Sequence, residues 1–199
     1  MQNIYDMHDA FFDYLKKFSA ETLSAEEKAL IKKVFYPLKL RKRQHLLQAG
    51  NCCVHLAFIL KGAMRQYVVD DKGIEHTSAL GIESWWMCDS ESFTLFTPST
   101  YYIDAWEDTE MLIMSRIDQL ELMKVPAFAE MVRLLNHNNN MANQRRITSS
   151  ISSSAEKRYT DFLTCHPELV LRFPQHLIAS YLGITKDTLS RIKRNLARK

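Results

Sequence analysis

The spacing of hydrophobic residues changes along the chain and divides it into four stretches. Residues 7–33 carry an apolar stripe at helical spacing, which breaks at 19–24 and restarts with a capping box at 24–27. Short runs rich in β-branched and aromatic residues follow at 35–40, 55–60, 64–69, 101–106 and 111–114. Helical spacing returns over 117–153, with a break at Pro126. The pattern predicts a helical lead-in, a β-domain, a long helix and a helical C-terminal part.

Turn signals separate the short β-rich runs. Gly62 follows Lys61 between two of them, and Asp70-Asp71-Lys72-Gly73 lies between alternating segments, as the turn of a hairpin does. Many short strands joined by tight turns are typical of an antiparallel sandwich or barrel, and not of a parallel sheet. The predicted fold class is therefore α+β, with an antiparallel β-domain followed by helices.

Residues 175–194 have the spacing of a DNA-reading helix-turn-helix. Ala179 is small where two helices must cross closely, and Gly183 lies where the chain needs a left-handed turn. The inward faces are supplied by Leu177, Leu182, Leu189 and Ile192. The alternative is an ordinary helical hairpin with a solvated basic face, but agreement at every position of the motif favours the DNA-binding interpretation.

The second helix of this motif presents a polar face suited to the major groove. Eight residues are predicted to contact DNA, the first of them also as the helix cap: Thr185, Lys186, Asp187, Thr188, Ser190, Arg191, Lys193 and Arg194. Arg191 matches the two acceptors of a guanine edge, and Asp187 matches the amino donor of a cytosine. The other hydroxyls and cations suit phosphate oxygens, which position a protein without carrying sequence information. Loss of Arg191 is therefore expected to relax specificity.

Composition agrees with a globular protein that has a basic end. Of the 199 residues, 46% are hydrophobic, which is enough to bury a core. The net charge of +3 is uneven, because residues 156–199 hold nine Lys or Arg against four acids, whereas residues 1–155 hold seventeen against nineteen. The chain shows neither a leader-like start nor a run of about 18 apolar residues, so a cytoplasmic protein without membrane contact is expected.

The sequence shows no catalytic or metal-binding signature. A phosphate loop, a metal triad and a nucleophile elbow are missing, so we expect no enzymatic activity, no cofactor and no metal. The four cysteines have neither metal nor redox spacing and are interpreted as reduced thiols, with a redox-sensing role for Cys52 or Cys53 as the alternative. A haem ligand among His45, His55 and His76 is the alternative to structural or exposed histidines.

The order of elements and the closing motif resemble the Crp/Fnr family of bacterial transcription factors, which is named for the cyclic-AMP receptor and the fumarate-nitrate regulator. The likeness covers nearly the whole chain. It includes Gly50 after Leu46-Leu47-Gln48-Ala49, the strand and turn at 58–62, and residues 155–159 ahead of the closing motif. The C-terminal segment looks most like the short members from the Bacteroidetes.

The resemblance implies three parts and a set of partners. These parts are a jelly-roll-like β-roll sensor of the cyclic-nucleotide-binding type over 1–115, a dimerisation helix over 116–154, and a winged-helix-like DNA-binding domain over 155–199. Any wing is expected at 169–173, or is missing because the chain stops directly after the recognition helix. The implied partners are double-stranded DNA with a palindromic operator, a second copy of the chain, RNA polymerase and an unknown small-molecule effector.

The long helix supplies the expected dimer interface. Its stripe comprises Met131, Leu134, Leu135, Asn138, Met141, Arg145, Thr148 and Ile151. Asn138 either fixes the register of the two helices at the expense of stability or is simply exposed. The alternative function is a ligand-binding or protein-interaction module whose helix-turn-helix does not read sequence.

The sequence departs from the family at the nucleotide pocket. Cyclic-nucleotide members hold the phosphate with an arginine, but here no arginine occurs between Arg65 and Arg116. A buried phosphate without a cationic partner is costly to desolvate, so cyclic AMP is not expected to bind. The candidate effector pocket comprises Glu83, Trp85, Trp86, Ser99 and Thr100. The apolar residues of this segment either line a pocket for another effector or plug the roll: Trp85, Trp86, Met87, Phe93 and Phe96.

Overall fold

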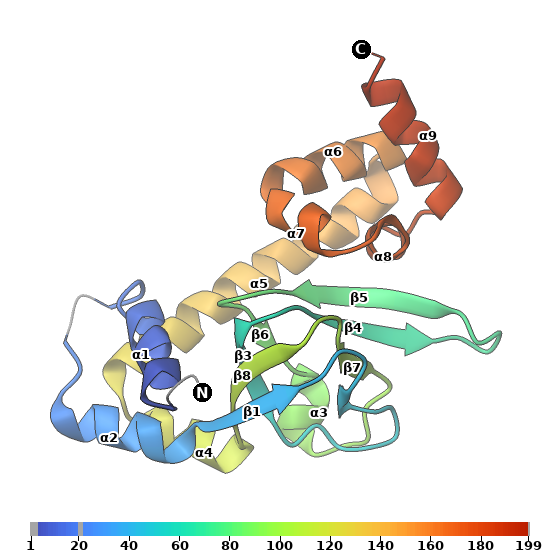
Figure 1. The fold of residues 1–199 in the computed structure, drawn as a ribbon. Coiled ribbons are helices and arrows are strands. Elements are labelled where there is room, and N and C mark those ends of the chain that lie inside the picture. Colours follow the sequence, from blue (N-terminus) through green and yellow to red (C-terminus); the bar gives the residue numbers. More distant parts are fainter. Residues whose placement is uncertain (1–3, 20–21, 199) are drawn as a thin grey trace. The chain divides into compact units, whose positions relative to one another are not determined.

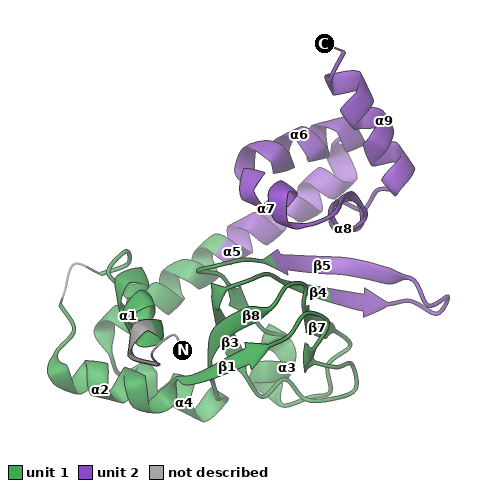
Figure 2. Ribbon diagram, in the orientation of Figure 1, with its two compact units in different colours: residues 1–66, 81–138 green, residues 67–80, 139–199 purple. Residues whose placement is uncertain are grey.

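The computed structural model describes residues 4–19 and 22–198, which form two compact units (Figure 2). Unit 1 comprises the residues up to 66 together with 81–138, and unit 2 comprises 67–80 and the residues from 139 onward. Helix α4 (Arg116–Leu122) begins at the expected start of the dimerisation helix, and α6 (Ala155–Cys165) begins at the expected start of the DNA-binding domain. The compact units divide within the long helix α5 (Pro126–Ser152).

Two four-stranded sheets form the β-roll (Figure 1). Their strands are β1 (Tyr36–Leu40), β2 (His45–Leu47), β3 (Leu56–Lys61), β4 (Met64–Val69), β5 (Glu75–Gly81), β6 (Trp86–Met87), β7 (Tyr102–Ala105) and β8 (Thr109–Met114). One sheet has the order β1-β8-β3-β6 and the other the order β2-β7-β4-β5. In the first sheet the strands pair antiparallel, with Ile113 of β8 opposite both Tyr36 and Ala57. The predicted β-domain and the hairpin at 70–73 are confirmed.

An aromatic cluster joins the helical lead-in to the roll of unit 1. The lead-in consists of α1 (Ile4–Leu15) and α2 (Ala25–Val34), and Ser24 and Glu27 form the predicted capping box of α2. Phe11 is fully buried, with its ring centroid 4.6 Å from that of Phe35 and 5.1 Å from that of Phe58. Phe128 and Met131 of α5 belong to the same cluster. The lead-in is therefore part of the core.

A second apolar cluster fills the space between the strands of unit 1. It includes Ile59, Ile103 and Met111, all of which are fully buried. Arg65 is also buried, and its guanidinium donates to both carboxylate oxygens of Asp104 at 2.9 and 3.1 Å. This two-point geometry satisfies a charge pair that would otherwise be costly to bury.

The C-terminal helices of unit 2 form their own small core. After α6 come α7 (Pro167–Arg172), α8 (Gln175–Tyr181) and α9 (Lys186–Leu196). Helix α6 packs on α7 and α9, and α8 packs on α9. The buried residues of these helices and of the connection before α8 are Tyr159, Phe162, Leu169, Phe173, Leu177, Ile178, Ala179, Leu189 and Ile192.

The expectation of a wing at 169–173 is wrong. Residues up to Arg172 belong to α7, and Leu169 and Phe173 are buried as apolar anchors of that helix and its end. Over the described span 155–198 the chain forms helices joined by short connections, without a strand. Leu171 of the same helix is 87% exposed, so the segment expected to hold any wing is a short helix with one buried side.

Candidate nucleic-acid interface

The turn between α8 and α9 has the geometry of a helix-turn-helix. Gly183 has a φ of +65°. The Gly183 N–H donates to the Ser180 carbonyl at 3.0 Å, and the Ile184 N–H donates to the Ala179 carbonyl at 2.9 Å. Ala179 is buried, and α8 packs on α9. The left-handed turn predicted at Gly183 is confirmed, because glycine takes this φ without the penalty of a side chain.

Thr185 starts helix α9. Its hydroxyl accepts a hydrogen bond from the Thr188 N–H at 3.1 Å and donates to the Thr188 hydroxyl at 2.9 Å. The predicted cap is confirmed. Asp187 lies in the first turn and Lys193 and Arg194 in the last turn, an order that complements the helix dipole. The start of α9 is therefore fixed by its own side chains, and the Thr188 hydroxyl retains a hydrogen to donate.

Helix α9 separates apolar and charged side chains onto opposite sides. Leu189 and Ile192 are buried, whereas Arg191 and Arg194 are exposed on the other side. Within the part of the chain that the structure describes, no ion pair or hydrogen bond engages the charged groups of Lys186, Asp187, Arg191, Lys193 and Arg194. These groups are available to a partner.

All eight residues predicted to contact DNA lie in α9 or directly before it. The exposed ones are Thr185, Lys186, Asp187, Arg191 and Arg194, and the half-buried ones are Thr188, Ser190 and Lys193. We call the seven from Lys186 to Arg194 in this set the α9 face. Asn195 and Arg198, which the prediction did not include, are also exposed and follow the α9 face along the chain. Helical periodicity alone would have found Asn195, four residues after Arg191.

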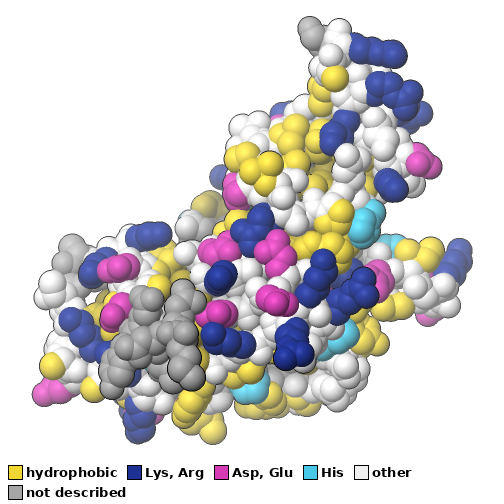
Figure 3. Space-filling view, in the orientation of Figure 1, with side chains coloured by type: hydrophobic (Ala, Val, Ile, Leu, Met, Phe, Trp, Pro, Cys, Tyr) yellow, Lys and Arg dark blue, Asp and Glu magenta, His cyan; other side chains and the backbone are white. Residues whose placement is uncertain are grey.

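The α9 face is strongly basic. Lys and Arg side chains gather over this end of unit 2 (Figure 3). From Lys186 to Arg198 the chain holds five basic residues, with Asp187 as the one acid. An excess of cations of this kind binds phosphates with release of counterions, which favours nucleic acid as the partner.

Most of the residues expected at an effector pocket are engaged inside unit 1. Trp86 packs into the aromatic cluster, and its indole N–H donates to the Tyr14 hydroxyl at 3.2 Å. Ser99 is buried, and Glu83 accepts a hydrogen bond from the Gly62 N–H at 2.8 Å. Trp85 is half-buried and Thr100 is exposed. Trp86 therefore packs on the side of the lead-in helices, whereas Met87 and Phe93 belong to the cluster between the strands, which fits the interpretation that these two residues plug the roll.

Asp89 places a buried carboxylate in the same segment. It caps α3 (Ser90–Leu95) by accepting from the Glu91 and Ser92 N–H groups at 3.1 and 3.4 Å. The Ser99 hydroxyl donates to its second oxygen at 2.7 Å. The hydrogen bonds of Asp89 are therefore made within the protein, and the segment adds no arginine that could hold a phosphate.

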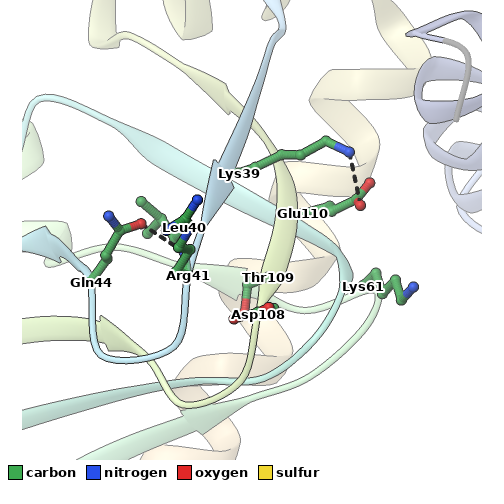
Figure 4. A pocket seen from close by; sticks show the side chains of 8 residues that line it. All are labelled: Lys39, Leu40, Arg41, Gln44, Lys61, Asp108, Thr109 and Glu110. Carbon is green, nitrogen blue, oxygen red and sulfur yellow. Dashed lines mark hydrogen bonds and ion pairs between the residues drawn. The ribbon is translucent and has the colours of Figure 1, made fainter. Parts of the chain in front are cut away.

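A surface hollow of about 450 Å³ lies elsewhere in unit 1, between the β1–β2 turn and β8 (Figure 4). It is lined by Lys39, Leu40, Arg41, Gln44, Lys61, Asp108, Thr109 and Glu110. Lys39 pairs with Glu110 at 2.9 Å, and Lys61 points away from the other side chains (Figure 4). The lining mixes both signs of charge and includes none of the five residues expected at an effector pocket.

The residues expected at a dimer interface have different environments along α5. Met131 is 1% exposed and belongs to the core, so its side chain is not available to a second copy of the chain. Leu135 packs against the same core. Leu134 and Met141 are half-buried, and Asn138, Arg145 and Thr148 are exposed. Ile151, the last residue of the predicted stripe, lies three residues after Thr148 and is 82% exposed.

Cysteines and possible metal ligands were the remaining candidates for a second site. All four cysteines are free, burial raises the pKa of the Cys53 thiol, and burial raises the pKa of Cys88 to about 12. A raised pKa disfavours the reactive thiolate, which counts against redox sensing by Cys53. Over 4–19 and 22–198, no group of three His, Cys, Asp or Glu side chains is arranged to hold a metal ion. Among the helices in these ranges, none is long and apolar enough to cross a membrane.

Comparison with known proteins identifies the fold. No protein-family model and no curated protein matches the sequence. FixK2 from Bradyrhizobium japonicum is 17% identical, with a TM-score of 0.71 over 83% of this chain and 85% of that chain. A CooA mutant from Carboxydothermus hydrogenoformans is 21% identical, with a TM-score of 0.68 over 93% and 84%. A protein from Eubacterium rectale assigned to the Crp/Fnr family is 21% identical, with a TM-score of 0.64 over 88% and 84%. The chain therefore has the fold of these proteins.

Substitutions of Gly183 test the geometry of the turn between α8 and α9. A Cβ at this position would meet no atom within 4 Å, so only the left-handed φ opposes a side chain. We expect Gly183→Ala to lower the free energy of unfolding by about 1–2 kcal/mol, and Gly183→Asn to lower it less, because Asn tolerates the left-handed region. Urea unfolding followed by circular dichroism measures both variants. An Ala variant as stable as the wild type would contradict the left-handed turn.

Proposed function

We propose that the protein is a DNA-binding transcriptional regulator of the Crp/Fnr type, which reads sequence with the α9 face. The observation that carries this proposal is a helix with one side buried and the charged side chains of its other side without partners in the described chain. The second helix of a helix-turn-helix enters the major groove with its outer side chains against base edges. The fold shared with the Crp/Fnr protein from Eubacterium rectale supports the same assignment.

Each polar residue of the α9 face has a role in this proposal. Arg191 donates to the two acceptors of a guanine, and Asp187, one helical turn earlier, accepts from a cytosine amino group. Lys186, Lys193 and Arg194 contact phosphates, as do the hydroxyls of the face. Specificity then depends mainly on Arg191, whereas affinity is shared among all the cations.

We infer that the protein binds DNA as a homodimer through α5. Leu134, Met141 and Thr148 recur every seven residues, and Ile151 continues the pattern with an exposed apolar side chain. A seam of this kind brings two copies of the same helix together and gives two recognition helices per dimer. These then reach half-sites about 34 Å apart on one side of the duplex.

Selection of random duplex DNA at one moderate salt concentration tests the proposal. We expect the wild type to select a palindromic consensus. Arg191→Ala is expected to lose the preference at one base pair in each half-site, equivalent to about 1–3 kcal/mol of discrimination. Lys193→Ala is the matched control, because loss of a phosphate contact weakens binding to all sequences alike and leaves the consensus unchanged.

Two results of this selection would contradict the proposal. Binding without a consensus, unchanged in Arg191→Ala, would exclude a sequence-reading regulator and favour the ligand-binding or protein-interaction module. A consensus without twofold symmetry would contradict the homodimer while leaving sequence reading by the α9 face in place.

We also infer that the roll does not take cyclic AMP as its effector. Residues 83–100, where the candidate effector pocket was expected, contain no arginine. They contain the buried carboxylate of Asp89, which accepts a hydrogen bond from the Ser99 hydroxyl. A negatively charged phosphate would have to displace this arrangement without gaining a cationic partner.

Thermal unfolding with added cyclic AMP tests this inference. A ligand that binds only the folded state raises the midpoint of unfolding as its concentration increases. We expect the same midpoint with cyclic AMP and with the linear nucleotide AMP as the control. A saturable rise with cyclic AMP alone would contradict the inference and place a phosphate site in the roll.

A further inference from the structure

Ser180, at the end of α8, is hydrogen-bonded to strand β5 within unit 2. Its hydroxyl accepts a hydrogen bond from the Thr77 N–H at 2.8 Å and donates to the Glu75 carbonyl at 3.4 Å. Strand β5 is the last strand of its sheet, so its outer backbone groups have no neighbouring strand. A single hydroxyl thus bridges a donor and an acceptor of the hairpin at residues 67–80.

Arg146 of α5 joins the same two elements. Its guanidinium donates to the Ser78 carbonyl at 2.5 Å, and its Cζ lies 4.9 Å from the ring centroid of Tyr181. Tyr181 in turn lies next to Phe162 of α6, with 5.7 Å between ring centroids. Ser180 and Tyr181 are consecutive, so both sets of contacts hold the same end of α8. We call Thr77, Ser78, Arg146, Ser180 and Tyr181 the hairpin latch.

The covalent connection to the C-terminal helices is short. Helix α5 ends at Ser152 and α6 begins at Ala155, which leaves Ser153 and Ser154 as the only residues between the two helices. Arg158 donates to the Ser150 and Ser153 carbonyls at 3.4 and 3.0 Å across this junction. A two-residue junction restricts the distance between two helices but still permits rotation about its backbone dihedrals. The hairpin latch provides a second attachment point, which fixes the rotation.

We propose that Arg146 and Ser180 are positioning residues, which hold the helix-turn-helix in one orientation on α5 and so set the spacing of the two half-sites. The inference rests on the proposed function, because it concerns how a dimer presents its two α9 faces. In such a dimer the separation of the recognition helices selects the spacing of half-sites on the duplex. Neither residue needs to touch DNA for this effect.

A library of duplexes tests the positioning role. Each duplex carries the two half-sites selected by the wild type, with the spacer between them varied one base pair at a time. We expect the wild type to prefer one spacer. Ser180→Ala and Arg146→Ala are expected to lose about tenfold in affinity at that spacer, the size of effect that accompanies loss of one hydrogen bond, and to accept neighbouring spacers. Their half-site consensus stays that of the wild type.

Two further variants separate positioning from general damage. Ser180→Thr keeps the bridging hydroxyl and is expected to restore the single preferred spacer. Asn143→Ala removes an exposed polar side chain from the same stretch of α5 and is expected to bind as the wild type does. A single preferred spacer shared by the wild type, Ser180→Ala and Arg146→Ala would overturn the proposal.

Hydrogen exchange tests the hairpin latch without DNA. The Thr77 N–H donates directly to Ser180, whereas the Arg146 guanidinium donates to the Ser78 carbonyl and lies over the Tyr181 ring. If these contacts act together, Arg146→Ala accelerates exchange at the Thr77 amide, whose hydrogen bond goes to Ser180 and not to Arg146. Exchange at the wild-type rate in Arg146→Ala would overturn a cooperative latch. Should the wild type select no consensus, the proposed function fails, and this exchange measurement still decides whether the latch exists.

Discussion

The burial of Leu189 and Ile192 beneath α9 is the interaction on which the proposed interface depends. Once these two side chains are inside, helical periodicity requires Arg191 and Arg194 to point outward. The crossing of α8 and α9 is possible because Gly183 accepts a left-handed φ and Thr185 caps the new helix at once. A small number of apolar and turn residues thus determines where a large set of charges is displayed.

The charged groups described in the two units differ in their partners. In unit 1, buried charged groups are satisfied internally: Arg65 binds Asp104, and Asp89 binds Ser99 and two backbone N–H groups. The α9 face of unit 2 has the opposite character, since its charged groups lack partners in the described chain. The filling of the roll by apolar residues such as Met87 and Phe93, together with a basic face without partners in the described chain, fits a protein whose DNA binding does not require a cyclic nucleotide.

Local sequence signals predicted most of the fold and of the α9 face, because they depend on neighbouring residues. The capping box at Ser24, the glycine turn at Gly183 and the cap at Thr185 each involve residues within a few positions of one another. Strand β6 and helix α3 escaped prediction because elements of two and six residues are too short to show a period.

Features that depend on distant residues were not predictable from spacing. Met131 fits a dimer stripe by periodicity, but its side chain is buried with Phe11 and Phe58 from the lead-in and β3. In the sequence, nothing distinguishes Ser180 from the other helical positions of the motif. In the fold its hydroxyl accepts a hydrogen bond from the Thr77 N–H, 103 positions earlier. The resemblance placed any wing at 169–173, yet most of this segment is helical and anchored inside unit 2 by Leu169 and Phe173.

The most direct measurement for the central claim is the ratio of two dissociation constants at one salt concentration. One is for the duplex that the wild type selects, and the other is for an unrelated duplex of the same length. A helix that reads base edges gives a ratio of about 10³ or more, and the weaker, nonspecific binding falls steeply with added salt. A ratio near one would show that the α9 face contacts phosphates only, and would contradict the account of this protein as a sequence-reading regulator.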